Sequence, residues 1–559
     1  MDDGKNHAQL KEIYSQKALA QIPRLLSQQD RNPFSPTYGC FYRIFWHDRA
    51  IDFPSAFAQF STHTLALVYA RPLTDNPFYR NSRIRDWTIA GLNYCLKIQH
   101  SDGSFDEFYP NERGWAGPTA FLMVALISSY ELLSNEIPEP SIQKLRKGAL
   151  LSARFLSQYE EEGILSNHHA LAILALYKIY QLLKEEWILD AVKRKIERLK
   201  SFASREGWFL EYDGPDLGYL SAMVSFLGKL FKAGYEDSEL FDLTQKAIEF
   251  CSYFIYPDDS FGGNIGSRQT VHFYPHGFEI LAPKISAAFS ILDKVLSGIA
   301  QGKILTPELQ EDRYFICRLP EFLEAYLDFT PRPQTLPLLP FEERDFDRYF
   351  DEAGIQIFKK DNLYGVCNYK KGGVLKLFSI SGKKLLYQDS GMTGVLPSGA
   401  MISTQWINSK TKITVQDKNT ICVRGRFHQI PNPYLTPPKM ILFRLVLLAI
   451  GWNLKWATWL KGQIRKKSSL GTKEVPIDFQ RTVSFSGTEL KIEDQIGLLG
   501  NQSPQRMKIG GEFLLRYVPQ SRYFTPNDLK DFGSELSSQE LTQLKTQGKL
   551  ALSRKIQFS

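Results

Sequence analysis

The stretch Glu206-Gly207-Trp208-Phe209 is one of four related turns that separate helical segments in the first part of the chain. Between these turns, apolar residues recur at positions i, i+3 and i+4, which indicates helices that bury one face. The turns return about every 45–60 residues, once per helical hairpin. Such a repeat is typical of a ring of stacked hairpins, because each hairpin can bury its apolar face only against its neighbours. We therefore expect an N-terminal (α/α) toroid over residues 1–330. The other three turns are Asp102-Gly103-Ser104-Phe105, Glu162-Gly163-Ile164-Leu165 and Asp258-Asp259-Ser260-Phe261-Gly262-Gly263.

A proline-rich segment follows the last helical pattern and opens a linker that we place at 331–345. Its sequence is Thr330-Pro331-Arg332-Pro333-Gln334-Thr335-Leu336-Pro337, and proline can continue neither a helix nor a central strand. Beyond the linker, short runs rich in β-branched and aromatic residues predict strands, for example at 354–358 and 374–378. We expect a C-terminal antiparallel β-sandwich over 346–559. Two domains also suit the length, since a single core rarely grows beyond about 250–300 residues.

The composition is that of a folded protein with large cores. The chain has 559 residues, of which 43% are hydrophobic and 23% are charged, so a predominantly disordered state is excluded. The formal net charge is +8, but the whole excess lies between Lys418 and Lys473, where the sequence contains no Asp or Glu. A local excess favours a surface contact over nucleic-acid binding, so we expect no nucleic-acid partner. The six cysteines are scattered, and we expect reduced structural thiols.

An apolar and basic insertion at about 438–467 interrupts the predicted strands. Its apolar run 440–452 contains Arg444 and is followed by Trp456, Trp459 and the cluster Arg465-Lys466-Lys467. A spanning helix needs about 20 largely apolar residues, so we do not expect this run to cross a membrane. Indoles and cations around an apolar stretch are typical of a helix that lies among lipid headgroups. We expect 440–467 to contact a membrane surface, with a buried helix, a dimer contact or a true span as alternatives.

The first residues of the chain, MDDGKNHAQLKEIY, are polar and lack the apolar core of a secretory signal. We therefore expect a cytoplasmic location, peripheral on the inner face of the membrane if the insertion binds lipid. The sequence does not indicate an oligomeric state.

Aromatic residues near the turns suggest a sugar site. In a toroid, the turns gather at one end of the ring and can form a concave surface there. Aromatic rings with polar neighbours suit the binding of sugars. We predict four such residues to be substrate-binding: Tyr109, Trp115, Trp208 and Tyr212.

Two short motifs lie at predicted helix starts. In Ser166-Asn167-His168-His169 a polar cap precedes an apolar helix, and in Gly214-Pro215-Asp216-Leu217-Gly218-Tyr219 a Gly/Pro loop brings Tyr219 to another helix start. With the predicted toroid and β-sandwich, these motifs make the chain resemble the heparinase II/III-like polysaccharide lyases, relatives of the alginate lyases and of uronyl epimerases. Segments 382–391 and 481–485, the latter leading into Glu493-Asp494, resemble parts of that family's β-domain.

The resemblance implies a carbohydrate-active enzyme that removes the C5 proton of a uronic acid. Its partner would be an anionic polysaccharide or a lipid-linked glycan. The sugar carboxylate is already negative, so the developing enolate charge needs preorganised donors, each worth about 3–4 kcal/mol. Asn167 and His168 would be these donors, and Tyr219 would be a general acid or base. Proton loss followed by β-elimination would make the protein a lyase, and the same proton loss also begins uronyl C5 epimerisation.

One departure from the family lies in the β-domain. The family usually has a histidine in a strand that here reads Asn368-Tyr369-Lys370-Lys371-Gly372-Gly373. We predict that Tyr369, Lys370 or Lys371 takes its place, with Tyr369 and Lys371 as further substrate-binding residues, or that Arg268 and His272 of the toroid do. The glycines of 262–266, directly before Arg268, would let the backbone approach a ligand. A glycan-binding scaffold without activity is the third interpretation.

The sequence offers residues for two further kinds of chemistry. A glycoside hydrolase would use a pair of carboxylates, and the chain offers Glu211, Asp213 and Asp216 near the second motif, among others. His272 and His276 have the i, i+4 spacing of helical metal ligands, but Pro275 between them argues against that helix. We therefore expect no metal. A phosphate-binding loop and a dinucleotide fingerprint are both missing from the sequence, so we expect no cofactor.

Overall fold

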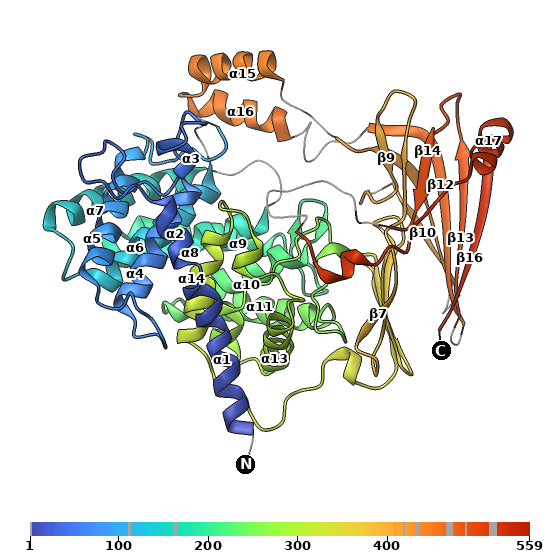
Figure 1. Ribbon diagram of the computed structural model, residues 1–559, viewed down its shortest axis with the longest axis horizontal. Coiled ribbons are helices and arrows are strands. Elements are labelled where there is room, and N and C mark those ends of the chain that lie inside the picture. Colours follow the sequence, from blue (N-terminus) through green and yellow to red (C-terminus); the bar gives the residue numbers. More distant parts are fainter. Residues whose placement is uncertain are drawn as a thin grey trace.

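The computed structural model describes residues 3–109, 113, 115–159, 165–407, 410–417, 420–431, 436–465, 473–486, 489–511, 513 and 523–558. In Figure 1 the helices of the first half of the chain lie together on one side and the strands of the second half on the other. The predicted turn at 162–164 and the basic residues Lys418, Lys466 and Lys467 fall outside the described residues.

The helical part is a closed double ring. The inner helices pack in succession and the last one packs back on the first; they are α4 (Ser61–Ala70), α6 (Ala116–Leu133), α8 (Ser166–Leu183), α10 (Leu217–Lys232), α12 (His276–Leu281) and α14 (Phe315–Leu327). Outer helices cover them; they are α5 (Ser82–Ile98), α7 (Glu139–Gln158), α9 (Glu186–Lys200), α11 (Ser238–Ser252), α13 (Ala287–Ala300) and α1 (Asp3–Leu19). Three short helices, α2 (Ile22–Gln28), α3 (Arg43–Trp46) and the 3-10 helix η1 (Phe57–Phe60), connect them. The predicted (α/α) toroid is therefore confirmed.

Composition decides which helices lie inside. Inner helix α6 is apolar on all sides, whereas outer helix α9 has charged residues on one face. A helix that is apolar all round must be covered on all sides. By length and hydropathy α6 is also the one described helix that could cross a membrane, but 78% of that stretch is buried inside the ring. Its hydrophobicity is accounted for by the core of the toroid.

The repeated turns share one geometry. The backbone N–H of His100 donates to Ser104 O, that of Ser204 to Trp208 O and that of Tyr256 to Ser260 O, at distances of 2.7 to 3.0 Å. Each turn contains a residue with positive φ: Gly103 at 90°, Gly207 at 95° and Asp259 at 61°. Glycine adopts this region without a steric cost, which explains the acidic-Gly pattern of the repeats.

The strands form two antiparallel sheets. The first has the order β3-β4-β5-β6-β7, with β3 (Phe346–Phe350), β4 (Ile355–Lys360), β5 (Leu363–Asn368), β6 (Val374–Ser379) and β7 (Lys384–Asp389). The second has the order β15-β14-β8-β9-β11-β12-β13-β16, with β10 paired to β11. Its strands are β8 (Met392–Val395), β9 (Met401–Ser403), β10 (Lys412–Asp417), β11 (Thr420–Gln429), β12 (Lys473–Ser486), β13 (Glu489–Leu498), β14 (Arg506–Ile509), β15 (Ser534–Glu535) and β16 (Lys549–Gln557); helix α17 (Ser538–Gln547) precedes β16.

Two hydrophobic cores follow from this layering. One fills the helical ring and continues onto the first sheet through Ile355, Ile357 and Phe378. The other lies between the two sheets and includes Leu375 and Phe479. The first sheet is thus covered on both faces, which explains the nearly continuous burial of β6. The described fold is the predicted toroid followed by an antiparallel β-sandwich.

The linker between α14 and β3 is anchored to the toroid. Arg332 and Glu279 form a buried ion pair, with Nη1 2.8 Å from Oε2 and Nη2 2.7 Å from Oε1. Tyr14 of α1 donates a hydrogen bond to the same carboxylate. A paired, bidentate geometry of this kind offsets part of the cost of burying both charges.

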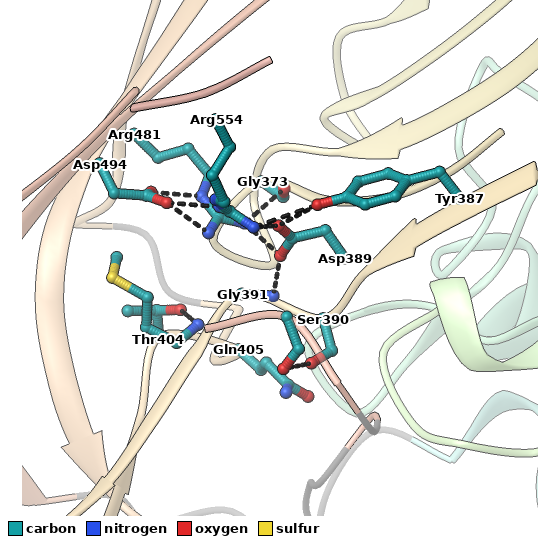
Figure 2. Close-up of polar contacts among 12 residues, drawn as sticks. Gly373, Tyr387, Asp389, Ser390, Gly391, Thr404, Gln405, Arg481, Asp494 and Arg554 are labelled. Carbon is teal, nitrogen blue, oxygen red and sulfur yellow. Dashed lines mark hydrogen bonds and ion pairs between the residues drawn. The ribbon is translucent and has the colours of Figure 1, made fainter. Parts of the chain in front are cut away.

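A second buried ion network lies inside the β-sandwich (Figure 2). Arg481 Nε is 2.7 Å from Asp494 Oδ1, and Arg481 Nη1 is 2.7 Å from Asp389 Oδ1. Arg554 bridges the other oxygens of both carboxylates at 2.6 Å. Gly391 N–H donates to Asp389 Oδ1 at 2.7 Å. The two segments that resemble the family's β-domain therefore meet in one structural cluster.

Candidate functional site

The candidate site lies at the end of the ring where α8 and α10 begin. A hairpin of β1 (Leu210–Glu211) and β2 (Gly214–Pro215) connects these two helix starts with the loop before α12. Glu211 pairs with Leu165 in a β-bridge, and Pro215 O accepts a hydrogen bond from Ser267 N–H at 2.7 Å. The hairpin thus brings the two predicted motifs together.

Asn167 binds a carboxylate of the protein itself. Its Nδ2 donates to Glu211 Oε1 at 2.8 Å, and its backbone N–H donates to Glu211 Oε2 at 3.1 Å. Ser166 Oγ donates to the same Oε2 at 2.9 Å. The amide that we expected to meet a substrate carboxylate therefore fastens the start of α8 to the β1–β2 hairpin.

Glu211 has an unusual protonation behaviour. Burial raises the pKa of its carboxyl to about 7, and the hydrogen bonds from Asn167 and Ser166 and the charge of His168 oppose this shift. His168 itself is partly exposed. Its ring lies against Gly117 of α6, where a Cβ would be 2.8 Å from His168 Cε1. Of the predicted Asn-His pair, His168 is the member whose side chain reaches the protein surface.

Asp216 positions Tyr219 at the first turn of α10. Its Oδ1 accepts the backbone N–H of Tyr219 at 3.0 Å and the hydroxyl of Thr270, and its Oδ2 accepts the backbone N–H of Arg268 at 3.0 Å. Burial raises the pKa of Asp216 to about 6 against the effect of these bonds. One capping carboxylate therefore fixes both Tyr219 and the loop that carries Arg268.

The predicted residues Tyr219, Arg268, His272 and Tyr212 form one cluster. The ring of Tyr219 lies edge-on to His272, with centroids 5.7 Å apart, and 6.4 Å from Tyr212. The Arg268 guanidinium lies over Tyr212 at 4.2 Å and is 2.7 Å from Asp213 Oδ1. His272 is fully buried. Burial raises the pKa of Tyr219 well above 10, so its phenol is protonated at neutral pH.

The turn between β5 and β6 reaches into this cluster from the β-sandwich. Lys371 Nζ donates to Asn264 O at 2.8 Å and to Gly266 O at 2.7 Å. Asn368 Nδ2 donates to Ile265 O at 2.9 Å and Asn368 Oδ1 accepts Lys371 N–H. Burial lowers the pKa of Lys371 to about 7. Lys371 is fully buried and supports the backbone of the loop before Arg268, so the structure shows a positioning contact where we predicted a contact with substrate.

The predicted substrate-binding roles of Trp208 and Tyr369 are wrong. Trp208 is buried in the ring core, with its Nε1 donating to Glu206 Oε2 at 3.0 Å within its own turn. Tyr369 is fully buried between the sheets, and its hydroxyl donates to Gln356 Oε1 at 2.7 Å. Side chains alternate along an extended chain, so Asn368 and Tyr369 point to opposite faces and only Asn368 meets the toroid.

Tyr109 and Trp115 contact the apolar insertion. The insertion forms helices α15 (Pro437–Ile450) and α16 (Leu454–Arg465). Tyr109 lies edge-on to Phe443 of α15 at 4.6 Å, and Lys461 Nζ of α16 lies 4.7 Å from the Trp115 ring. These two aromatics therefore join the edge of the ring to the helical hairpin, and their binding of sugar stays a prediction.

His276 lies apart from His272, at the opposite end of the ring. Helix α12 begins at His276 with Pro275 as its N-cap, so the two histidines do not share a helix face. His276, Glu321 and Glu324 place donor atoms within 4.8 Å of one another. The Lys229 ammonium pairs with both carboxylates of this group. A protein cation therefore already pairs with the two carboxylates that a metal ion would need at this place.

The arrangement at the starts of α8 and α10 suits an anionic ligand. The N-terminal ends of α8 and α10 meet here, and their N–H groups already bind the carboxylates of Glu211 and Asp216. A protonated phenol, two imidazoles and a guanidinium come from different segments of the toroid around them. These groups can bind a negative charge and donate a proton next to it.

Comparisons with known proteins support the fold. No family model and no curated protein matches the sequence. The solved chondroitin AC lyase of Streptomyces coelicolor A3, in complex with chondroitin sulphate, is similar over 90% of this chain and 68% of that chain, with a TM-score of 0.52 and 9% identity. A Paenibacillus xanthan lyase aligns with 91% of this chain at a TM-score of 0.48 and 11% identity, and this chain covers 47% of its length. The chain thus shares the fold of the chondroitin lyase.

Proposed function

We propose that the protein is a polysaccharide lyase that acts on a uronic-acid-containing anionic glycan, with the resemblance to heparinase II/III-like enzymes as its basis. The observation that carries the proposal is the Tyr219 cluster: a protonated phenol beside His272 and Arg268, at the converging starts of two inner helices. The shared architecture with a chondroitin lyase supports it at the level of the fold.

The proposed reaction breaks the C5–H and C4–O bonds of the uronic acid and forms a C4–C5 double bond. His168 would stabilise the negative charge of the carboxylate and the enolate. Tyr219, whose phenol is protonated at neutral pH, would give its proton to the leaving glycosidic oxygen. His272, in contact with the same ring, would take the C5 proton, and Arg268 would hold Tyr212 and the loop in place.

Hydrolysis by paired carboxylates has less support. Glu211 and Asp216 each accept hydrogen bonds from three groups of the protein. A hydrolase needs a carboxyl group that is free to reach the glycosidic oxygen. Their hydrogen bonds indicate that Glu211 and Asp216 position other groups of the protein.

The test is a panel of uronate polymers incubated with the purified protein. We expect new absorbance in the near ultraviolet from the C4–C5 double bond, and a 10²- to 10⁴-fold lower rate (an order-of-magnitude range) for Tyr219→Phe. Tyr235→Phe, a change on the outer part of the ring, is the matched control and should keep the parent rate. New reducing ends without absorbance would indicate a hydrolase, solvent deuterium at C5 without chain cleavage would indicate an epimerase, and binding without turnover would indicate a scaffold. Each of these three outcomes would overturn the lyase proposal.

A further inference from the structure

The helical hairpin α15–α16 turns its apolar side chains away from the protein. In Figure 1 the two helices lie together at the outer edge of the toroid near α3. Large apolar side chains on one continuous face of the hairpin are 51–70% exposed, among them Leu442, Leu445, Leu448, Trp452, Trp456 and Trp459. The face is much larger than the isolated apolar residues that a soluble surface normally carries.

The opposite face of the hairpin holds it on the toroid. Leu447 and Ala457 are buried, and Phe443 packs on Tyr109. Two cations also point inward: Arg444 pairs with Asp52 at 3.1 Å, and Lys461 lies over Trp115. A helix on a soluble surface has the reverse pattern, with charges outward and apolar residues inward. The contacts therefore fix the hairpin in an orientation that presents its apolar face.

Charge and aromatic content identify what this face fits. Residues 436–465 contain no Asp or Glu, and the exposed side chains include Lys439 and Lys455. Indole rings prefer the boundary between headgroups and acyl chains, and lysines near it attract anionic lipids. A second copy of the chain would bring the same lysines face to face without a partner charge on this hairpin. The composition thus favours an anionic bilayer over self-association.

The length of the helices decides how the hairpin meets a bilayer. Helix α15 has 14 residues, which corresponds to about 21 Å at the usual rise and is shorter than the roughly 30 Å hydrocarbon core. A helix of this kind lies along the interface with one face among the acyl chains.

We propose that the α15–α16 hairpin is a docking surface for an anionic lipid bilayer. Because its inner face rests on Tyr109 and Trp115, docking would place that edge of the toroid next to the membrane. The lipid contact does not depend on the lyase proposal, and it would suit a glycan substrate that is attached to lipid.

Vesicle flotation of the full-length protein tests the proposal. With vesicles of phosphatidylcholine and about 30% phosphatidylglycerol we expect flotation and a blue shift of tryptophan emission, and weaker binding to pure phosphatidylcholine. The double variant Leu448→Glu/Trp456→Glu should lose flotation. The matched control is Phe34→Glu/Leu529→Glu, which adds the same charge at two other apolar residues that are 93% and 77% exposed, and it should float like the parent. All four positions are exposed, so circular dichroism should show an unchanged fold.

A second variant tests the charge contribution. Lys439→Gln/Lys455→Gln should lower the affinity for anionic vesicles by roughly fivefold per lysine and leave binding to neutral vesicles unchanged. Absence of parent flotation, or equal flotation of both glutamate variants, would overturn the proposal. So would a dimer in light scattering that Leu448→Glu/Trp456→Glu dissociates, because the face would then belong to a second copy.

Discussion

Replacing Arg481 by methionine should destabilise the β-sandwich more than any surface change. The side chain is fully buried and pairs with Asp389 and Asp494, whose side chains have no exposed surface. After the change, these two carboxylates keep only Arg554 as a cationic partner, so one buried negative charge is left uncompensated. Removal of one partner from a buried ion network costs about 3–5 kcal/mol. This cost corresponds to a roughly 10²- to 10⁴-fold increase in the open population of the sandwich.

Hydrogen exchange followed by mass spectrometry measures this effect locally, in peptides from β12 and β13. A site-resolved method is needed because a chain with two cores does not have to unfold in a single step. The matched control is Arg506→Met, since Arg506 is 72% exposed and its partner Glu535 is 58% exposed, so no buried charge loses its partner. We expect the control to increase exchange much less. Equal effects of the two variants, or an effect of Arg481→Met below tenfold, would refute the reasoning.

Three further predictions concern the site. The folded protein holds the Glu211 proton up to about pH 7, whereas the unfolded chain releases it near pH 4.5. The stability that Glu211 contributes should therefore fall as the pH rises across this range. In Glu211→Gln the midpoint of urea unfolding should depend less on pH over the same range. Burial lowers the pKa of Lys371 from 10.5 to about 7, so the stability of the protein should rise with pH between these values. In Lys371→Met this rise should be absent when the urea midpoint is measured over the same pH range. Gly218→Ala would place a Cβ 2.4 Å from Thr270 O, and we expect the free energy of unfolding, measured by thermal unfolding, to fall by about 1–3 kcal/mol. The control Gly497→Ala should show no such loss, because nothing lies within 4 Å of its Cβ.

The architecture could be predicted because its signals are local and repeated. The three acidic turns that the structure describes close with the same backbone bond, and the positive φ of Gly103 and Gly207 explains why the pattern is visible in the sequence. Pro275 likewise argued against a helix that carries both His272 and His276, and α12 begins only at His276. Such features depend on a few neighbouring residues and on the period of the helix.

The candidate site was harder to predict because its contacts join distant segments. The motif around Asn167 indicated a helix start correctly, but its amide partner, Glu211, is 44 residues away. Trp208 was expected in a groove, yet an aromatic residue after a turn can equally close the end of a hairpin. Tyr369 and Asn368 are neighbours in sequence, and the strand register alone decides which of them reaches the toroid.

The orientation of the insertion could not be predicted from the sequence either. Its composition predicted an interfacial element, but composition cannot say which side of a helix faces the protein. Only the structure shows that Arg444 and Lys461 face the ring, where they contact Asp52 and Trp115.

The contact of the β5–β6 turn with the loop at 264–266 has a consequence for how such a protein can change over time. The first sheet shares a core with the ring, and Lys371 and Asn368 brace the loop that carries Arg268. The two halves are therefore not interchangeable modules. A gene fusion that exchanged the C-terminal half would also remove the contacts that hold the loop before Arg268, so the two halves should change together by substitution rather than by exchange of whole domains.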